Sequence, residues 1–347
     1  MLIKKLIMNN YTLFEKQTIE FDDGINIFIG ENGTGKTHIL KLLYSACQAT
    51  NPKVGFAHKL VKTMLPDDYK LSRLVTRKAG NHSTSVSVNA YSRAKGTSRI
   101  LSAEFSNKTK KWEAEVTGEE NWEKDFKNIS SIFIPAKEIL SNSYNLAAAV
   151  GRSNVKFDDT YIDIINSAKI DISVGRNSQE RDEKLTRIEQ IIGGKVNYDA
   201  SNDEFYLKKG NSKQEFTLVA EGIRKMALLW QLVKNGTLEK GSVLFWDEPE
   251  ANINPRYISI IVDLLLQLQR DGVQIFVSTH DYMLAKYFEI RRTDADSIKF
   301  HSLNKEKDEV VYSSSDKFSN LKDNVILKSF EELLDEVYSS EVNGSDI

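Results

Sequence analysis

The feature that most constrains this chain is the segment from Gly30 to Thr37, which reads GENGTGKT. It matches the pattern G-x-x-x-x-G-K-[ST] at every fixed position. An apolar, strand-like run at residues 25–29 precedes it, and a helical pattern that starts at Ile39 follows it. A strand, a loop and a helix in this order are what a phosphate-binding loop requires, so we predict a nucleotide-binding α/β fold.

Each residue type in this loop contributes to phosphate binding. Glycines allow backbone N–H groups to point at a polyphosphate, and the helix N-terminus adds a favourable dipole. Lys36 can reach the β- and γ-phosphates, and Thr37 can ligate Mg²⁺. We therefore expect ATP and Mg²⁺ as ligands. The expected nucleotide contacts in this region are Gly30, Glu31, Asn32, Gly33, Thr34, Gly35, Lys36, Thr37 and His38.

Composition limits the class of protein. A chain of 347 residues can bury a large core, and 40% hydrophobic with 28% charged residues is typical of a soluble globular protein. The net charge of -2 gives no overall attraction to nucleic acid. The single cysteine, Cys47, suits a reducing compartment and is expected to be buried. Without a signal-peptide core or a long apolar run, we expect a cytoplasmic protein that does not span a membrane.

Two groups of strands are predicted in the first third of the chain. Residues 2–8, 17–21 and 25–29 form the first group, before the phosphate loop. A mixed, partly helical stretch follows at residues 51–83. Three neighbouring strands, at residues 83–92, 98–106 and 110–116, are expected to form an antiparallel meander.

The remaining chain alternates between strands and helices. A short apolar run at residues 132–134 indicates a return to the central sheet, and a second excursion covers residues 142–214. That excursion is predicted to hold a charged helix at 180–192 and strands at 195–199 and 204–208. From residue 215 the predicted order is strand 215–218, helix 222–233, strand 243–246, helix 257–268 and strand 274–278, which favours a parallel, helix-covered sheet. A helix at 326–337 and a frayed polar end at 339–347 complete the chain.

Two polar segments at strand ends complete the predicted nucleotide site. The apolar strand 243–246 runs into Asp247 and Glu248, as a P-loop hydrolase requires. Asp247 would hold Mg²⁺ either directly or through the ion's other ligands, and Glu248 would orient and polarise the attacking water. The strand 274–278 ends near His280, which could donate a hydrogen bond to the γ-phosphate. Taken singly, a surface acidic turn or an inert surface histidine is the alternative interpretation.

These motifs resemble those of the ABC-type ATPases, most closely the OLD-like and RecF/SMC-like branch. The resemblance rests on the phosphate loop, on Asp247 to Pro255 (DEPEANINP) and on Ser278-Thr279-His280. In that family two ATPase heads enclose two ATP molecules. The resemblance implies that Glu248 is the catalytic base, that His280 is the switch residue, and that residues 252–255 cross the dimer interface. Lys36 completes the expected catalytic set.

Two family elements are altered in this sequence. Residues 135–138 (PAKE) stand where the family has its Q-loop, but no glutamine is present. The signature segment would be residues 219–225 (VAEGIRK), in which Ala220 replaces a serine and Glu221 replaces a glycine. Only Gly222 and the start of a helix remain, so Gly222 is the expected nucleotide contact from this segment. A helix start without function explains these residues equally well.

A basic cluster offers a second possible interface. It consists of Arg93, Lys95, Arg99, Lys108, Lys110 and Lys111, with Arg73, Arg77 and Lys78 just before it. Such a face could contact nucleic-acid phosphates or an acidic partner. Glu104, Glu113 and Glu115 are interleaved, so a solvated charged surface is the favoured interpretation.

The resemblance and the predicted elements together give one hypothesis. The fold is expected to be an α/β P-loop ABC-type ATPase head with a mostly parallel central sheet, an antiparallel β subdomain and a helical or mixed insertion. We expect a single discontinuous domain over 1–347, with a core at 1–50, 130–142 and 215–318, insertions at 51–129 and 143–214, and a C-terminal helix and tail at 319–347.

The expected function is ATP hydrolysis by a homodimer, or a higher homo-oligomer, that shares its ATP sites. The 66 residues after Asp281 leave no room for the TOPRIM nuclease domain of OLD proteins, so a separate effector, such as a nuclease or toxin, is the expected partner. The resemblance suggests a role in bacterial antiphage defence. Two alternatives stay open: a RecF-like repair ATPase that binds DNA directly, and a scaffold that binds ATP with negligible turnover.

Overall fold

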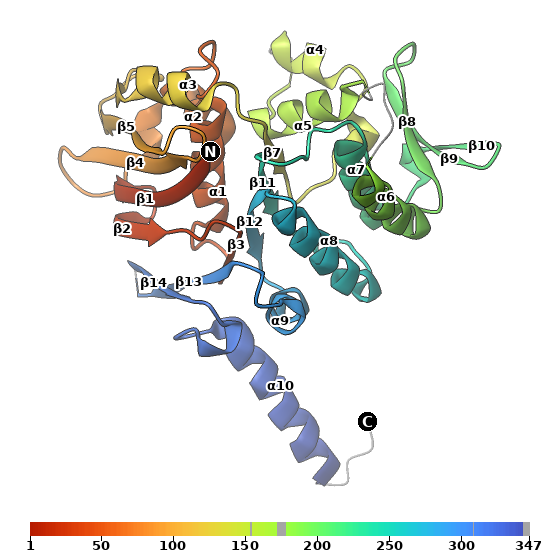
Figure 1. Ribbon diagram of the computed structural model, residues 1–347. Helices are drawn as coiled ribbons and strands as arrows, with labels where there is room; N and C mark the ends of the chain where they lie inside the picture. The colour runs from red at the N-terminus through yellow and green to blue at the C-terminus, as the bar shows by residue number, and fades with distance from the viewer. Residues whose placement is uncertain (153–154, 172–177, 308, 343–347) are drawn as a thin grey trace.

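A six-stranded sheet forms the centre of the computed structural model, which describes residues 1–152, 155–171, 178–307 and 309–342. The strand order is β14-β13-β3-β12-β11-β7 (Figure 1). All neighbours are parallel except β14, which pairs antiparallel with β13 at one edge. The strands are β3 (Ile25–Gly30), β7 (Ser131–Ile134), β11 (Val243–Asp247), β12 (Gln274–Thr279), β13 (Ile298–Glu306) and β14 (Glu309–Ser315). The predicted mostly parallel sheet, with a return at residues 132–134, is confirmed.

Several helices begin at side chains that cap their first turn. Asp158, Ser178 and Asp281 each accept a hydrogen bond from a backbone N–H in the helix that follows. The helices are α1 (Lys36–Gln48), α2 (Phe56–Met64), α3 (Glu119–Phe126), α4 (Leu146–Gly151), α5 (Asp159–Lys169), α6 (Gln179–Ile192), α7 (Glu221–Lys234), α8 (Ile258–Arg270), α9 (Tyr282–Arg291) and α10 (Val325–Val342). The predicted helices at 180–192, 222–233 and 257–268 are confirmed by α6, α7 and α8.

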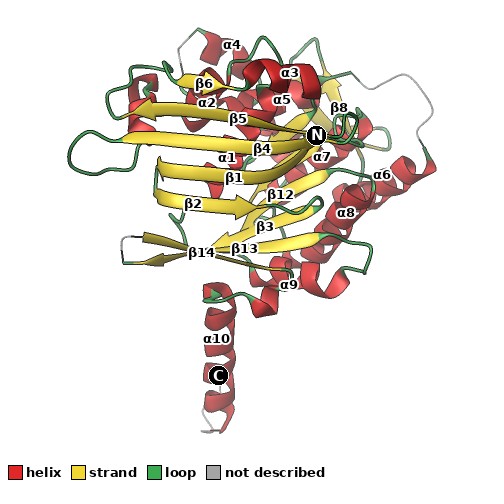
Figure 2. Ribbon diagram, turned by 60° about the vertical axis from the view of Figure 1, so that its left-hand side comes forward, coloured by secondary structure: helices red, strands yellow, loops and turns green. Residues whose placement is uncertain are grey.

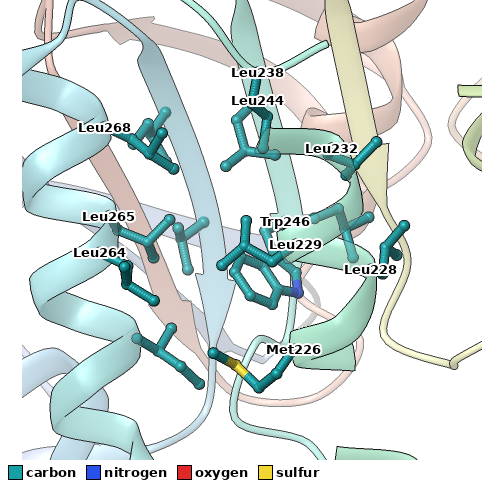
Figure 3. Close-up of a cluster of buried hydrophobic side chains, with 14 of the residues drawn as sticks. Met226, Leu228, Leu229, Leu232, Leu238, Leu244, Trp246, Leu264, Leu265 and Leu268 are labelled. Atoms are coloured by element: carbon teal, nitrogen blue, oxygen red, sulfur yellow. The ribbon is translucent and has the colours of Figure 1, made fainter. Parts of the chain in front are cut away.

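The central strands face a hydrophobic core on each side of the sheet. In β11, Val243 and Phe245 belong to the core that contains α1, whereas Leu244 and Trp246 belong to the core that contains α7 and α8. Figure 3 shows Trp246 between the leucines of α8 and the side chains of α7. Successive side chains of a strand point to opposite faces, so a strand covered on both sides is apolar at nearly every position. This double burial explains the continuous apolar run before the acidic pair.

A second, antiparallel sheet has the order β2-β1-β4-β5-β6 and shares its core with α1. Its strands are β1 (Leu2–Tyr11), β2 (Phe14–Glu20), β4 (Ser83–Ser92), β5 (Thr97–Ser106) and β6 (Glu115–Thr117). The predicted strand 110–116 is wrong over most of its length. Hydrogen bonds from Thr109 N to Ser106 O and from Glu113 N to Lys110 O close local turns there, so these backbone groups do not join a strand ladder.

The second excursion holds helices and a small antiparallel sheet. Strands β8 (Lys195–Asp199), β9 (Glu204–Lys209) and β10 (Ser212–Glu215) lie in the order β10-β9-β8, and the first two confirm the predicted pair. The predicted strand 215–218 is wrong. Phe216–Leu218 is a 3-10 helix, closed by a hydrogen bond of 3.0 Å from Val219 N to Phe216 O. A single local turn therefore replaces a strand whose apolar residues suited either structure.

The C-terminal helix is longer than predicted and stands away from the rest of the molecule. It covers residues 325–342 rather than 326–337, and both views show it leaving the body (Figures 1 and 2). The frayed end predicted for 339–347 is wrong for 339–342, which are helical, and residues 343–347 lie outside the described part of the chain.

Two expectations about the whole chain can be compared with the described residues. Cys47, in α1, is fully buried, as expected, and burial raises the pKa of its thiol to about 12. The thiol is therefore protonated and unreactive at neutral pH. Among the helices of the described ranges, none combines the length and apolar character that a membrane span requires.

Candidate active site

The phosphate loop leaves the end of β3 and enters α1 in a conformation that only glycines allow. Gly30 and Gly33 have φ values of 141° and 77°. A Cβ atom on Gly30 would lie 1.9 Å from the carbonyl oxygen of Leu303 on the neighbouring strand β13. Glycine is therefore required where the loop turns away from the sheet. The tip, at Glu31, Asn32 and Gly33, is exposed and accessible to a ligand.

Lys36 folds back over this loop. Its Nζ atom donates hydrogen bonds of 2.8 Å to the carbonyl oxygens of Gly30 and Glu31, and it lies 3.5 Å from Nδ1 of His280. Burial lowers the pKa of the Lys36 ammonium to about 8. An anionic phosphate would be a stronger partner for this cation than neutral carbonyl groups. The ammonium is thus held at the loop, ready for an anionic ligand.

Thr37 and Asp247 meet beside the loop and form a suitable magnesium site. The Thr37 hydroxyl lies 3.1 and 3.0 Å from the two carboxylate oxygens of Asp247, and Ser278 donates a further hydrogen bond to Oδ1 of Asp247. Burial raises the pKa of Asp247, against the opposing effect of these hydrogen bonds. A buried carboxylate next to a hydroxyl offers the hard oxygen ligands that Mg²⁺ prefers, so these residues fit the ion.

Glu248 and His280 face each other at the same edge of the sheet. Oε1 of Glu248 lies 3.2 Å from Nε2 of His280, and burial lowers the pKa of the imidazole, so it is neutral at neutral pH. Since the Lys36 ammonium can only donate, Nδ1 of His280 accepts and Nε2–H donates to Glu248. Glu248 itself has a φ of 49°, a left-handed conformation that is uncommon outside glycine.

Glu250 is a site residue that the sequence prediction missed. Its Oε1 atom accepts hydrogen bonds from the Thr279 hydroxyl (2.7 Å) and from the backbone N–H of His280 (3.1 Å). Its Oε2 atom is buried, with no hydrogen-bond partner among the described residues, and burial raises the pKa of the carboxyl. Glu250 thus fixes the backbone of His280. Its position two residues after Glu248 is the only sequence signal that could have indicated this role.

Lys225 is the second residue that the sequence prediction missed, and it contacts the backbone of the loop that carries Glu248. Only 1% of its surface is exposed, and its Nζ atom donates to the carbonyl oxygen of Ala251 (2.8 Å) and lies 3.5 Å from that of Glu248. Burial lowers the pKa of this lysine. Lys225 therefore links α7, the helix that follows the altered signature, to the loop that carries Glu248.

The segment that replaces the Q-loop is also connected to α7. Glu138 Oε2 accepts a hydrogen bond of 2.6 Å from Nε of Arg224, and only 1% of the Glu138 side chain is exposed. Nη1 of Arg224 donates to the carbonyl oxygens of Phe216 and Val219, the former over 3.1 Å. A partly buried, hydrogen-bonded ion pair thus lies in the segment where the sequence resemblance expects a Q-loop glutamine.

Gly222 and His38 are the two expected nucleotide contacts that lie outside the loop and the two strand ends. Gly222, in the first turn of α7, packs against the loop after Glu248, and a Cβ atom there would lie 2.5 Å from the carbonyl oxygen of Asn252. His38 lies in the first turn of α1, where its Nδ1 atom is buried with no hydrogen-bond partner in the described structure. Burial lowers the pKa of His38, so its imidazole is neutral. Their expected roles as nucleotide contacts stay predictions.

The loop, Glu248 and His280 open into one pocket with a volume of about 730 Å³. One wall consists of Gly30, Glu31 and Asn32, and another of the first two turns of α10. The structure therefore brings Lys36, Thr37, Asp247, Glu248 and His280, predicted from distant parts of the sequence, to one edge of the central sheet.

Part of the basic cluster is paired with carboxylates. Lys95 donates to Asp125 over 2.7 Å, Arg99 pairs with the same carboxylate over 2.6 Å, and Lys78 pairs with Glu15. These pairs neutralise part of the local charge. The favoured interpretation, a solvated and partly paired charged surface, is consistent with this arrangement.

Comparison with known proteins places this site in a family. Residues 25–285 match the family described as "AAA domain, putative AbiEii toxin, Type IV TA system". The chain belongs to this family. The matched residues of this AAA-domain protein include the phosphate loop, the Asp247-Glu248 pair and His280, and therefore every element of the site above except the wall formed by α10.

Two curated RecF proteins resemble a short part of the chain. The DNA replication and repair protein RecF of Geobacillus thermodenitrificans is 32% identical over 62 residues, and that of Ruminiclostridium cellulolyticum is 36% identical over 62 residues. In each case the match spans 18% of this chain and 17% of the RecF protein.

Solved SMC heads resemble nearly the whole chain in fold. An SmcHead bound to the C-winged helix domain of ScpA gives a TM-score of 0.61 at 11% identity, covering 91% of this chain and 98% of that chain. A Pyrococcus furiosus Smc head with an extended coiled coil, bound to the C-terminal domain of ScpA, gives 0.56 at 11% identity, covering 97% and 99%. These likenesses confirm the predicted ABC-type head fold.

Proposed function

We propose that this protein hydrolyses ATP and dimerises around it. The observation that carries this proposal is the convergence of the phosphate loop, the Thr37–Asp247 contact and the Glu248–His280 contact at one sheet edge. Mg²⁺, when bound with ATP, would neutralise phosphate charge and polarise the γ-phosphoryl group. Within the chain, Lys36 would hold the β- and γ-phosphates, and Thr37 with Asp247 would hold the ion.

Glu248 would act as the general base in this mechanism. Its carboxylate accepts a hydrogen bond from neutral His280, which orients it and leaves the second oxygen available for a water proton. Glu250 would hold His280 at the required place by accepting the backbone N–H of that residue. Proton removal by Glu248 would therefore depend on two further side chains: His280, which orients Glu248, and Glu250, which holds His280.

In the dimer, the second copy of the chain would complete the ATP site of the first. The pocket beside the loop is open, and Gly222 of a second copy would approach ATP there, as it does in the ABC arrangement that the sequence resembles. Residues 252–255 would lie at the same interface. We propose that residues 1–347 form a single discontinuous ATPase domain of the OLD-like branch of the ABC-type ATPases.

The proposed biological role is control of a separate effector in antiphage defence. The family description names a putative toxin of a toxin–antitoxin system, which supports an association with such a system. The two SMC heads of similar fold are bound to domains of ScpA, so a head of this fold can carry a partner protein. ATP-driven closure and opening of the dimer would change the surface offered to the effector.

The decisive experiment uses the Glu248→Gln variant, in which ATP hydrolysis should be blocked with ATP still bound. With ATP and Mg²⁺, light scattering after size exclusion is expected to show a dimer, and without nucleotide it is expected to show the dissociated form. Lys36→Ala is the matched control, which should not respond to ATP. A Glu248→Gln protein that keeps the same mass with and without ATP would contradict the shared-site model.

A RecF-like function is the second candidate, favoured by the similarity to two RecF proteins. It requires direct, salt-sensitive DNA binding in the presence of ATP. Neutralising Arg93, Lys95 and Arg99 should then weaken DNA binding, although the last two already pair with Asp125. DNA binding that is absent, or unchanged by these substitutions, would leave the effector model as the better one.

A further inference from the structure

Helix α10 is attached to the body only by its first turns. Its packing partners in the described structure include α9 and β3, and the ring of Phe330 stacks on Tyr282 of α9 at 4.0 Å between centroids. Beyond Phe330, residues 331–339 are all exposed. Both views show this part of the helix projecting into solvent (Figures 1 and 2). A solvent-surrounded helix of this length gains little stability from its own hydrogen bonds, so a packing partner would stabilise it.

The exposed part of α10 carries an apolar stripe. Leu333 is 54% exposed, Leu334 37%, Val337 38% and Tyr338 63%. With 3.6 residues per turn these side chains share one face, and Phe330 extends the same face toward the body. Four large apolar side chains gathered on one helical face, unlike single surface leucines, indicate a protein interface.

The charge of α10 identifies the kind of partner. Residues 325–340 contain Glu331, Glu332, Asp335 and Glu336 but only one cation, Lys328, giving a formal charge of -3, more than the -2 of the whole chain. Glu331 and Glu336 border the apolar stripe on its two sides. Two such helices would repel each other, which disfavours a second copy of this chain as the partner. The same carboxylates disfavour nucleic acid and an anionic membrane surface.

We propose that α10 is the docking site of a partner protein that presents a cationic amphipathic helix. The leucines and Val337 would fill the apolar face of that helix, and the bordering glutamates would pair with its lysines or arginines. This inference deepens the proposed function, on whose separate effector it rests, by naming the surface and the chemistry that would bind the effector.

The root of α10 connects this docking site to the nucleotide pocket. Val325, Ile326, Ser329 and Phe330 line the pocket together with Glu31 and His280. Tyr282, which stacks on Phe330, follows His280 by two residues. A change at the γ-phosphate end of the pocket therefore acts on residues in direct contact with the docking helix.

The test measures binding of a designed peptide to the full chain by fluorescence anisotropy. The probe is a labelled helical peptide of about 18 residues, built from Leu, Lys and Ala with one apolar face flanked by lysines. A matched peptide carries Glu in place of every Lys. The wild-type chain is expected to bind the lysine peptide at least about tenfold more tightly than the glutamate peptide, and less tightly as salt rises.

Variants assign this binding to α10. Leu333→Ser with Val337→Ser should weaken binding of the lysine peptide about tenfold or more and leave ATP turnover unchanged, since neither residue lines the pocket. Ile100→Ser with Val311→Ser removes apolar side chains that are 55% and 38% exposed elsewhere, and should leave binding unchanged. Replacing the four acidic residues by their amides should remove the salt dependence.

Two results would overturn the proposal. One is equal binding of both peptides, or binding that the α10 variant does not change. The other is a wild-type dimer, seen by sedimentation without nucleotide, that Leu333→Ser with Val337→Ser dissociates, because a second copy would then cover the stripe. Lys36→Ala should lose ATP turnover yet keep peptide binding, so failure of the ATPase proposal and failure of the docking proposal can be told apart.

Discussion

The two halves of the candidate nucleotide site are built by different means. The phosphate-loop half contains Gly30 to Thr37 and Asp247, where glycine geometry and side-chain hydrogen bonds position the groups. The signature half contains residues 219–225, where the family pattern is largely lost and the cations Arg224 and Lys225 hold the loops instead. The first half is thus specified by backbone conformation, and the second by charged side chains that reach across the fold.

The largest expected effect comes from removing the cation of the phosphate-loop half. Lys36→Ala should lower the rate of ATP turnover on the order of 10²–10³-fold, because a preorganised charge at the phosphates is lost. A malachite-green phosphate assay measures the rate. If turnover in the wild type is negligible and Lys36→Ala does not change it, the protein is a nucleotide-binding scaffold rather than a hydrolase.

The next effect tests whether the signature half depends on its buried lysine. Lys225→Met keeps the length of the side chain but leaves the carbonyl of Ala251 without its donor. The free energy of unfolding should fall by about 1–3 kcal/mol, and turnover by roughly tenfold or more as Glu248 loses support. Lys234→Met, in the last turn of the same helix, is the matched control and should change neither quantity. Equal effects of both substitutions would argue against a specific role of Lys225 in supporting the Glu248 loop.

The third prediction is a pH dependence of ATP binding that comes from Lys36. The pKa of Lys36 is about 8 without nucleotide, and phosphate anions would raise it, so ATP binding should take up protons near that pH. Affinity is expected to fall as pH rises from about 7.5 to about 9.5, where free Lys36 is largely neutral. Calorimetry in buffers of different ionisation enthalpy measures the proton uptake. The same series with Lys36→Arg should lose the dependence, since arginine stays charged.

The smallest effect concerns Glu250. Burial raises the pKa of its carboxyl in the folded state, so the folded protein binds more protons and loses stability as pH rises from about 4.5 through that raised pKa. Glu250→Gln keeps an oxygen acceptor for the His280 N–H and cannot ionise, so this variant should be more stable than the wild type near neutral pH. Urea unfolding at several pH values measures the difference. A difference that does not shrink toward acid pH would contradict this assignment.

The phosphate-loop half was predictable because its chemistry restricts residue types. Only glycine fits at Gly30, and only a hydroxyl beside a carboxylate fits at Thr37 and Asp247, so the pattern itself carries the geometry. The alternation of apolar strands and helices likewise predicted the central sheet, because strands buried on both faces read as apolar runs. The wrong strands, 110–116 and 215–218, lie where local turns take up the backbone hydrogen bonds.

The signature half was not predictable, because its contacts join residues far apart in the sequence. Glu138 and Arg224 are 86 positions apart, and no local pattern indicates that they pair. Lys225 did leave a signal. It shares helical spacing with Leu228, Leu229 and Leu232, so a charged residue lies on the apolar face of α7. A cation in such a position is rarely left without partners, which marks it as a functional or structural contact.

The place of β3 within the sheet has a consequence for the order of folding during synthesis. Although β3 precedes the phosphate loop, its neighbours are β12, paired from Ile275 to Thr279, and β13, paired from Ile298 to Leu303. Both edges of β3 therefore stay unpaired until about 250 further residues have left the ribosome. A growing chain cannot form its ATP loop early, and the exposed apolar strand is a target for chaperones until the last strands arrive.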